Sequence, residues 1–478
     1  MGATDPVGSC SVPRAGEPVG PPVVKRPKNR KAQIALVAAE LFCRRGYHGV
    51  GVDEIAAAVG ISGPAVYRHF PNKYAILMQA THDLVEAAQA VVADALDGPA
   101  AAADPHRRLD DALAGLTRLS VDRRKVTGLY QWEARYLTPE HQLEFRAELS
   151  ELVGRLAEVL RQERPDLTHF SARLLTRGAL SVISSPATHR AALGRGRGEP
   201  LLRRGAWVVL TAPGSDILEP TSSVAAPATG PEAVTALATG SGSGSGSGLA
   251  TGSGSGLATG SGPGSGQAAG PGGGGGQVVG PRAGGGQVIA PPVGVSSRRE
   301  ILLAEAITLF HRQGYHSVGI EDIGRAAGIN ASSVYRYFPS KADLLAAIYY
   351  RAAEQVTAAT SVSLAEASDL EDALWRLVGR YGDLTFRQSE LVAVYQAENN
   401  NLPAPDRHEL RKVQRLQVEE WVRLVVGIRP ELTPADARVL VHAALNLIND
   451  LGAGAPAPPP PGLEAQLAGL ALSVLRES

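Results

Sequence analysis

The side chains best suited to recognition chemistry lie in one phrase that the chain carries twice: AVYRHFPNK at residues 65–73 and SVYRYFPSK at residues 333–341. An arginine guanidinium can donate two parallel hydrogen bonds to guanine O6 and N7, and tyrosine and histidine side chains can donate to phosphates or base edges. The lysine that closes each phrase is one of only seven in the chain. These residue types can contact nucleic acid, but an isolated phrase of this kind is more typical of an ordinary helical domain, with core aromatic residues and a solvated arginine.

Short helices around a glycine turn are expected to position these side chains. The pattern predicts a helix that ends at Gly46, a second helix over 52–59, a tight turn at Gly60 and a third helix capped by Ser62. Pro64 falls in the first turn of that third helix, where a missing N–H costs little. This is a helix-turn-helix, and its third helix carries the repeated phrase.

The flanks of the third helix carry further signals. Val66 and Phe70 are four residues apart on one face, which we expect to point into a core. Asn72 is placed to cap a fourth helix with Lys73 in its first turn, and a helix N-terminus with a lysine is a phosphate site. A lysine there is otherwise unfavourable against the helix dipole, yet both copies keep it. In the second copy the turn and the cap are supplied by Gly328 and Asn330.

The similarity between the two halves extends far beyond the phrase. Between residues 46–77 and 314–345, 16 of 32 positions are identical. With a shift of 265, LYQWE at 129–133 matches VYQAE at 394–398. Apolar residues recur at helical spacing in both halves, at Ile34, Ala38, Leu41 and Phe42 and again at Leu302, Ala306, Leu309 and Phe310. The sequence therefore predicts an all-α protein with two domains of one fold.

Composition divides the chain into six segments. We expect a disordered leader at 1–24, a first helix-turn-helix domain at 25–79 and a first further helical domain at 80–217. A flexible linker rich in glycine and serine follows at 218–292. A second helix-turn-helix domain at 293–347 and a second further helical domain at 348–478 come after it.

Other classes of protein are disfavoured by the sequence. The 47 basic and 47 acidic residues leave no net charge, and the two cysteines, Cys10 and Cys43, do not make a disulfide framework. The sequence has no HExxH motif, no metal-spaced cysteine and histidine set and no phosphate-binding loop outside the linker. No apolar run is long enough to span a membrane, and the N-terminus does not resemble a secretory signal. We expect a cytoplasmic protein without enzymatic activity, catalytic residues, cofactor or metal.

Both halves resemble the DNA-binding region of the tetracycline-repressor (TetR) family. The resemblance rests on LFCRRGYHGVGVDEIAAAVGISGPAVYRHFPNKYAIL in the first half and LFHRQGYHSVGIEDIGRAAGINASSVYRYFPSKADLL in the second. It implies two TetR-like modules fused in tandem, each a helix-turn-helix domain followed by a helical domain for ligand binding and dimerisation. Such proteins are dimeric, ligand-released transcriptional regulators, usually repressors.

The resemblance also assigns DNA-contacting positions. They are Pro64, Ala65, Tyr67, Arg68, His69 and Lys73 in the first copy, and Ser332, Ser333, Tyr335, Arg336, Tyr337 and Lys341 in the second. One position departs from the family, which usually has a threonine facing a phosphate near the start of the second helix. Val52 and Ile320 stand there instead. The heptapeptide KRPKNRK at 25–31 is either an arm that follows the DNA or a solubilising tail.

The family also implies an effector pocket in each helical domain. By this resemblance the residues that line it are Tyr130, Trp132, Arg135 and Tyr136 in the first half and Tyr395 and Gln396 in the second. The effector is expected to be a small apolar or amphipathic molecule. The last two helices of each half, near 168–185, 198–212, 434–450 and 462–476, are expected to form a four-helix dimer interface.

Two questions stay open at this point. One chain could form the whole pseudo-dimer and recognise an asymmetric operator, because its two recognition helices differ, or two whole chains could pair as a homodimer. The chain could also be a ligand sensor in which one or both helix-turn-helix domains have lost specific DNA binding.

Overall fold

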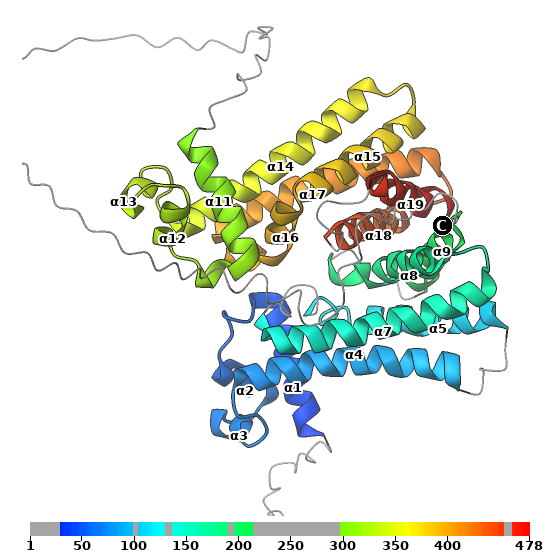
Figure 1. Cartoon of the computed structure of the whole chain (residues 1–478), viewed down its shortest axis with the longest axis horizontal. Helices are drawn as coiled ribbons and strands as arrows, with labels where there is room; N and C mark the ends of the chain where they lie inside the picture. Colours follow the sequence, from blue (N-terminus) through cyan, green and yellow to red (C-terminus); the bar gives the residue numbers. More distant parts are fainter. Residues whose placement is uncertain (1–28, 99–103, 130–135, 190–195, 214–296, 454–460) are drawn as a thin grey trace, which may run out of the picture. The chain divides into compact units, whose positions relative to one another are not determined.

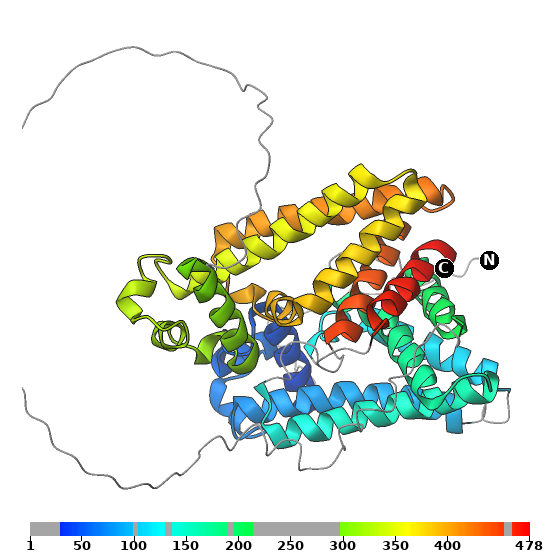
Figure 2. The same ribbon diagram turned by 45° about the horizontal axis from the view of Figure 1, so that its top comes forward.

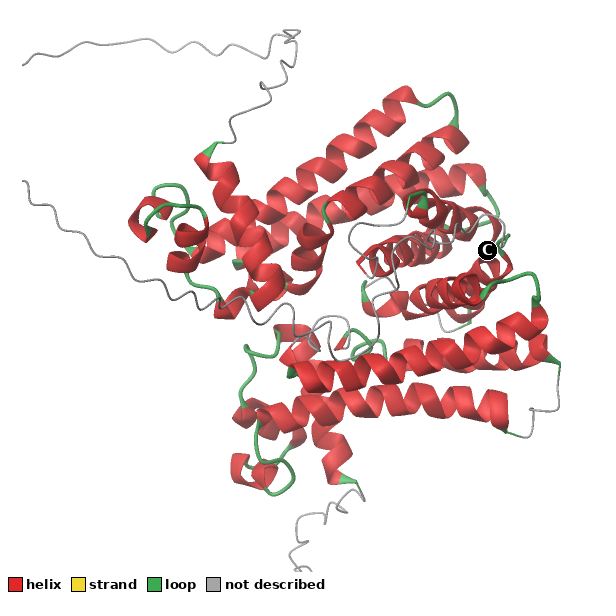
Figure 3. Cartoon of the chain, viewed as in Figure 1, coloured by secondary structure: helices red, strands yellow, loops and turns green. Residues whose placement is uncertain are grey.

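The computed structural model describes residues 29–98, 104–129, 136–189, 196–213, 297–453 and 461–478. All regular secondary structure in these ranges is helical (Figure 3). The expected leader and linker lie outside the described residues, as do Tyr130, Trp132 and Arg135. The described residues before and after the linker fall in one compact unit.

The described helices of the two halves follow the same order, except that α16 has no counterpart among the described residues of the first half (Figure 1). The first half contains α1 (Arg30–Arg45), α2 (Val52–Val59), α3 (Gly63–Tyr67), α4 (Lys73–Asp97), α5 (Pro105–Asp122), α7 (Pro139–Glu163), α8 (His169–Ser184) and α9 (Gly198–Thr211). The second half contains α11 (Arg298–Gln313), α12 (Ile320–Ala326), α13 (Ala331–Val334), α14 (Lys341–Glu366), α15 (Leu370–Arg387), α16 (Ser389–Ala397), α17 (Ala404–Ile428), α18 (Pro434–Ala453) and α19 (Leu463–Glu477). Three short 3-10 turns in the described part are η3 (Ser185–Ala187), η5 (Tyr315–Ser317) and η6 (Asn399–Asn401).

Local signals set the ends of the first helices as predicted. α1 ends before Gly46, whose φ of 77° suits glycine and whose N–H donates to the Phe42 carbonyl at 2.7 Å. The second helix covers Val52–Val59 and is followed by Gly60 in the left-handed region. Gly328 has the same conformation in the second half, with a φ of 70°.

The fourth helix of each half joins the helix-turn-helix to the helical body. α4 runs without a break across the expected boundary between residues 79 and 80, and α14 does the same between 347 and 348. Each of these helices therefore belongs both to a helix-turn-helix and to a helical body.

Three apolar cores hold the described residues together. Each helix-turn-helix packs into one smaller core, around Phe42 in the first half and Phe310 in the second, which also includes residues of the adjoining body such as Leu129 and Leu391. The third core is shared by the helical bodies of both halves. Within it α8 and α9 lie beside α18 and α19 (Figures 1 and 2).

Polar contacts accompany the apolar packing between the halves. Asn446 Nδ2 donates to the Ser181 carbonyl at 2.8 Å, and these two positions correspond under the shift of 265. The rings of His189 and His442 stack with their centroids 4.1 Å apart. The helices expected at the dimer interface thus pack against one another within a single chain.

Candidate nucleic-acid interface

Each third helix buries its apolar pair and exposes the polar side chains between. Val66 and Phe70 are 0% and 2% exposed, whereas Tyr67 is 55% exposed and Arg68 and His69 also face solvent. The second copy repeats the pattern, with Val334 and Phe338 buried and with three exposed side chains between them, Tyr335, Arg336 and Tyr337. The predicted orientation of both phrases is confirmed.

The third helices are shorter than the sequence suggests. α3 ends at Tyr67, so Arg68 is its C-cap residue and His69 follows the helix. α13 ends at Val334, and Tyr335 is its C-cap residue. The exposed side chains therefore project from a single helical turn and from the bend that follows it.

The two third helices begin differently. Asn330 caps α13 with its side chain, which accepts from the Ser333 N–H at 2.9 Å. Ser62 occupies the cap position of α3 but makes no side-chain capping bond, which corrects the prediction. Pro64 has no N–H that could donate to the Ser62 side chain. The Ala65 N–H donates to the Ser62 backbone carbonyl at 2.9 Å instead.

The first turn of each third helix offers small or polar groups to solvent. Pro64 and Ser332 are exposed, and Ala65 and Ser333 are half-buried. The two heads, as we call the helix-turn-helix domains, therefore have the same shape but different surface chemistry at these positions.

The lysine at the start of the fourth helix is held by the protein itself. Lys73 Nζ donates to the carbonyls of Tyr47 and Val50, at 2.9 and 3.0 Å, and lies 4.3 Å from the centroid of the Tyr47 ring. Burial lowers the pKa of this ammonium below its usual value. Two of the three N–H groups of the Lys73 ammonium thus hold the loop between α1 and α2 in place. These bonds explain why a lysine stands at the N-terminus of α4, where the helix dipole disfavours a positive charge.

Lys341 makes the same contacts in the second head. Its Nζ donates to the carbonyls of Tyr315 and Val318, both at 2.8 Å, and lies 4.2 Å from the centroid of the Tyr315 ring. Burial lowers the pKa of Lys341, while the nearby carboxylate of Glu398 acts in the opposite direction. In each head one N–H of the lysine ammonium is not used in these two bonds and could contact a phosphate.

The positions that replace the family's threonine belong to the cores. Ile320 is 6% exposed, and Val52 packs against the first core. Neither apolar side chain can donate a hydrogen bond to a phosphate. At the fourth helix, Asn72 caps α4 as predicted by accepting from the Ala75 N–H at 2.8 Å.

Only the end of the expected basic arm is described. Residues 25–28 lie outside the described ranges, and Asn29 caps α1 with its side chain. Lys31 Nζ lies 5.5 Å from the centroid of the Phe70 ring, and the Arg299 guanidinium lies 5.1 Å from that of Phe338. Each head therefore places one cation of its first helix beside the phenylalanine of the repeated phrase.

The described residues expected to line the effector pockets lie in tightly packed surroundings. Tyr136 stacks on Tyr47 of the first head, with centroids 5.5 Å apart. Tyr395 stacks on Tyr349 at 4.6 Å, and burial raises its pKa to about 12. Gln396 is half-buried. These contacts place Tyr136 at a junction with a head, and they place Tyr395 within a stack of aromatic rings.

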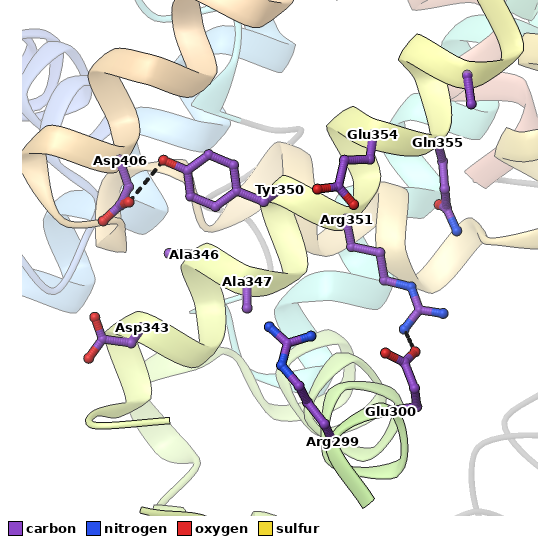
Figure 4. A pocket seen from close by; sticks show the side chains of 11 residues that line it. Arg299, Glu300, Asp343, Ala346, Ala347, Tyr350, Arg351, Glu354, Gln355 and Asp406 are labelled. Atoms are coloured by element: carbon purple, nitrogen blue, oxygen red, sulfur yellow. Dashed lines mark hydrogen bonds and ion pairs between the residues drawn. The ribbon is translucent and has the colours of Figure 1, made fainter. Parts of the chain in front are cut away.

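A groove of about 680 Å³ lies between α11, α14 and the start of α17 (Figure 4). Several of its polar groups are paired with one another: Arg351 with Glu300, and the Tyr350 hydroxyl with Asp406, to which it donates at 3.0 Å. It is an open surface groove beside the second head, and it does not contain Tyr395 or Gln396.

One buried carboxylate, Glu398, lies in the segment aligned with the expected effector-pocket residues, but its contact with the head was not predicted. Glu398 is 0% exposed and accepts a hydrogen bond from the backbone N–H of Tyr315 in the second head, at 3.0 Å. The only signal in the sequence is its alignment with Glu133 in the LYQWE segment. Spacing could not show that this side chain points at the head.

Two structural features are absent from the described residues. None of the helices found there is both long and apolar enough to cross a membrane. Within the same ranges no three histidine, cysteine, aspartate or glutamate side chains are grouped so that they could hold a metal ion.

Each of the two helix-turn-helix scaffolds presents an exposed turn with a tyrosine and an arginine. The family model described as "Bacterial regulatory proteins, tetR family" matches residues 34–80 and 302–348, which are the two heads. The chain therefore carries two matches to this family model in tandem, which together cover 94 of its 478 residues.

Two curated relatives match parts of the chain. The transcriptional activator FasR of Mycolicibacterium smegmatis is 48% identical over 44 residues, which are 9% of this chain and 20% of FasR. The transcriptional repressor KstR2 of Rhodococcus jostii is 32% identical over 114 residues, which are 24% of this chain and 56% of KstR2. The chain thus spans about a fifth and about half of the lengths of these relatives.

Solved structures of the family also align with the chain. A TetR-family regulator from Bordetella parapertussis is 21% identical, with 36% of this chain and 93% of that chain covered and a TM-score of 0.34. PfmR from Thermus thermophilus is 25% identical, with coverages of 37% and 96% and a TM-score of 0.33.

Proposed function

We propose that this chain is a sequence-specific DNA-binding transcriptional regulator with two unlike heads. One observation carries the proposal. In both heads a buried valine and phenylalanine leave a tyrosine, an arginine and a second aromatic residue exposed at the same point of the helix-turn-helix, at 67–69 and 335–337. Arg68 and Arg336 supply the guanidinium groups suited to guanine, and the aromatic side chains supply donors for bases or phosphates.

The two heads should prefer different half-sites. Pro64 and Ala65 offer no side-chain donor where Ser332 and Ser333 offer hydroxyl groups. The aromatic residue that follows each arginine is a histidine in the first head and a tyrosine in the second. Because direct readout depends on such donors, we expect an asymmetric operator.

We further propose that one chain forms the whole pseudo-dimer. The support is the shared core of α8, α9, α18 and α19, together with the bond from Asn446 to Ser181. Under this proposal the four-helix interface is already satisfied within the chain, which leaves no equivalent surface for a second copy.

The regulator is proposed to be a repressor that a small-molecule effector releases from DNA. The name of KstR2, whose match covers the longer stretch, favours repression, whereas FasR is an activator by name. The effector would bind in the helical bodies and act on the heads through α4 and α14. We propose no enzymatic activity, and we place the protein in the cytoplasm because its DNA partner is there.

The test is a selection of DNA sequences by the purified full-length protein from a random-sequence pool. Two unlike half-sites at fixed spacing would support the proposal. A perfect palindrome would show that identical heads from two chains act together and would overturn the single-chain arrangement. Retention without any enriched sequence would overturn specific DNA binding.

A second candidate function is a ligand sensor without specific DNA binding. Two observations favour it: the ammonium groups of Lys73 and Lys341 are mostly engaged within the protein, and the phosphate-facing threonine is absent at Val52 and Ile320. The retained exposed arginines oppose it. The sensor would retain DNA only weakly, and its DNA binding would not depend on Arg68 or Arg336.

A further inference from the structure

Glu398 is a buried carboxylate that joins the second body to the second head. Its Oε1 accepts a hydrogen bond from the Tyr315 backbone N–H at 3.0 Å, and its Oε2 accepts one from Asn401 Nδ2 at 2.6 Å. A buried carboxylate is costly unless such bonds are made. The stability of the folded protein therefore depends on the Tyr315 amide staying within hydrogen-bond distance of this side chain.

The amide that Glu398 holds lies at the entry to the helix-turn-helix. Tyr315 begins η5, the turn between α11 and α12, directly after Gly314 with its φ of 76°. Lys341 binds the carbonyls of Tyr315 and Val318 in the same turn, each at 2.8 Å. The turn is thus bound through its N–H by an anion and through its carbonyls by a cation.

The other end of this connection is α16. Glu398 follows the last residue of that helix, and its own N–H donates to the Val394 carbonyl at 2.9 Å. The hydroxyl of Tyr349 on α14 donates to the carbonyls of Val394 and Tyr395, at 3.0 and 2.6 Å. A shift of α16 must therefore move Glu398 or break its bond to the turn.

We propose that Glu398 is a positioning residue, whose carboxylate fixes the entry turn of the second head to α16. Through this bond, and through the apolar contacts of Leu391 and Val394 in the same core, the position of α16 determines where α12 and α13 lie, and so whether the second head can engage its half-site. This inference rests on the proposed function, because it assigns a regulatory contact to a DNA-binding head.

Three substitutions of Glu398 in the whole protein distinguish the effect of its charge from the effect of its side-chain length. Glu398→Ala removes both hydrogen bonds, Glu398→Asp keeps the charge but is one methylene too short, and Glu398→Gln keeps an oxygen that can accept from Tyr315. Glu409→Ala is the matched control, because Glu409 is an exposed glutamate on α17 that pairs with Lys412 at 2.8 Å.

The first measurement is hydrogen exchange of the Tyr315 amide by NMR or mass spectrometry. We expect exchange to be roughly tenfold faster in Glu398→Ala and Glu398→Asp, because the amide loses its buried acceptor. Glu398→Gln and Glu409→Ala should stay close to wild type. Unchanged exchange in Glu398→Asp and Glu398→Ala would overturn the proposal, and faster exchange throughout α15 and α18 would do the same by making Glu398 a general core residue.

The second measurement is binding to the DNA that the wild-type protein selects from a random pool. Glu398→Ala and Glu398→Asp should bind it roughly tenfold more weakly, and the difference from wild type should vanish when the second half-site is scrambled. An equal loss with either half-site scrambled would overturn the positioning role. A wild-type protein that selects no sequence would overturn the proposed function instead, and the exchange rates would still decide whether Glu398 holds the turn.

Discussion

At the scale of individual residues, Arg68 and Arg336 are expected to determine which DNA sequences the two heads prefer. Arg68 and Arg336 are both exposed, and each stands beside an exposed tyrosine on a short scaffold that its own core holds in place. The core fixes the backbone from which each guanidinium group projects, without a long helix behind it. The short length of α3 and α13 is therefore compatible with recognition.

We expect Arg68→Ala and Arg336→Ala each to weaken binding by about 1–3 kcal/mol at one half-site only, because each removes one bidentate contact to a base. Titration of operators in which one half-site at a time is scrambled measures this. Arg312→Ala, a substitution of an exposed arginine at the end of α11, is the control. If neither recognition arginine matters, the heads do not lie in the grooves.

Between helices, the crossing of the second and third helices of a head depends on a small residue. An added Cβ at Gly324 would lie 2.9 Å from the Ile329 carbonyl oxygen and 3.2 Å from Val334 Cγ2. The first head accommodates Ala56 at the corresponding place, with 2% of its surface exposed. The crossing in the second head is therefore closer than the sequence similarity implies.

We expect Gly324→Ala to destabilise the second head by about 1–3 kcal/mol, because the contact with a backbone carbonyl cannot relax freely. Gly379→Ala is the matched control: Gly379 is exposed on α15, its added Cβ would meet nothing within 4 Å, and alanine there should stabilise by up to about 1 kcal/mol. Denaturant unfolding of both variants compares the two changes. Equal effects would contradict a close crossing.

At the scale of the whole molecule, the shared core predicts the mass of the protein in solution. If α8, α9, α18 and α19 complete one interface within the chain, light scattering should give a mass near 49.8 kDa at micromolar concentration. Asn446→Leu should not change the mass but should destabilise the protein, because the Ser181 carbonyl loses its buried donor. A mass near twice 49.8 kDa would instead require two chains to pair.

The stacked histidines between the halves should make stability depend on pH. Burial, then the neighbouring ring and Arg124, lowers the pKa of His189 to about 2, and burial with Arg438 lowers that of His442 to about 4. Both rings are neutral in the folded protein, whereas the unfolded chain takes up protons below about pH 6.5. The free energy of unfolding should therefore fall as the pH drops from about 6.5 towards 4.

At pH 5 each of these rings should account for a loss of about 2 kcal/mol. Denaturant unfolding at pH 7.5 and at pH 5 measures the difference, and His442→Gln should remove a large part of it. His311→Gln, which changes an exposed histidine at the end of α11, should leave it intact. An equal pH dependence in wild type and His442→Gln would contradict the role of the pair.

Local signals in the sequence were enough to establish the class of fold and the two recognition phrases. Helical periodicity, glycine turns and the repeated Val-Tyr-Arg need no knowledge of long-range contacts. They predicted α2 within its observed bounds and the burial of Val66 and Phe70. They could not show that the Ser62 side chain, two residues before Pro64, has no capping role.

The groups that meet across long stretches of chain could be identified only from the folded structure. Lys341 reaches back to Tyr315 and Val318, Glu398 reaches the same turn from the body, and Asn446 meets Ser181 across the linker. Nothing in local spacing sets the direction of such a side chain, because its partners lie far away in the sequence. The packing of the apolar cores sets those directions. The exposure of the side chains in the two phrases therefore followed from the sequence, and the connection of the heads to the bodies did not.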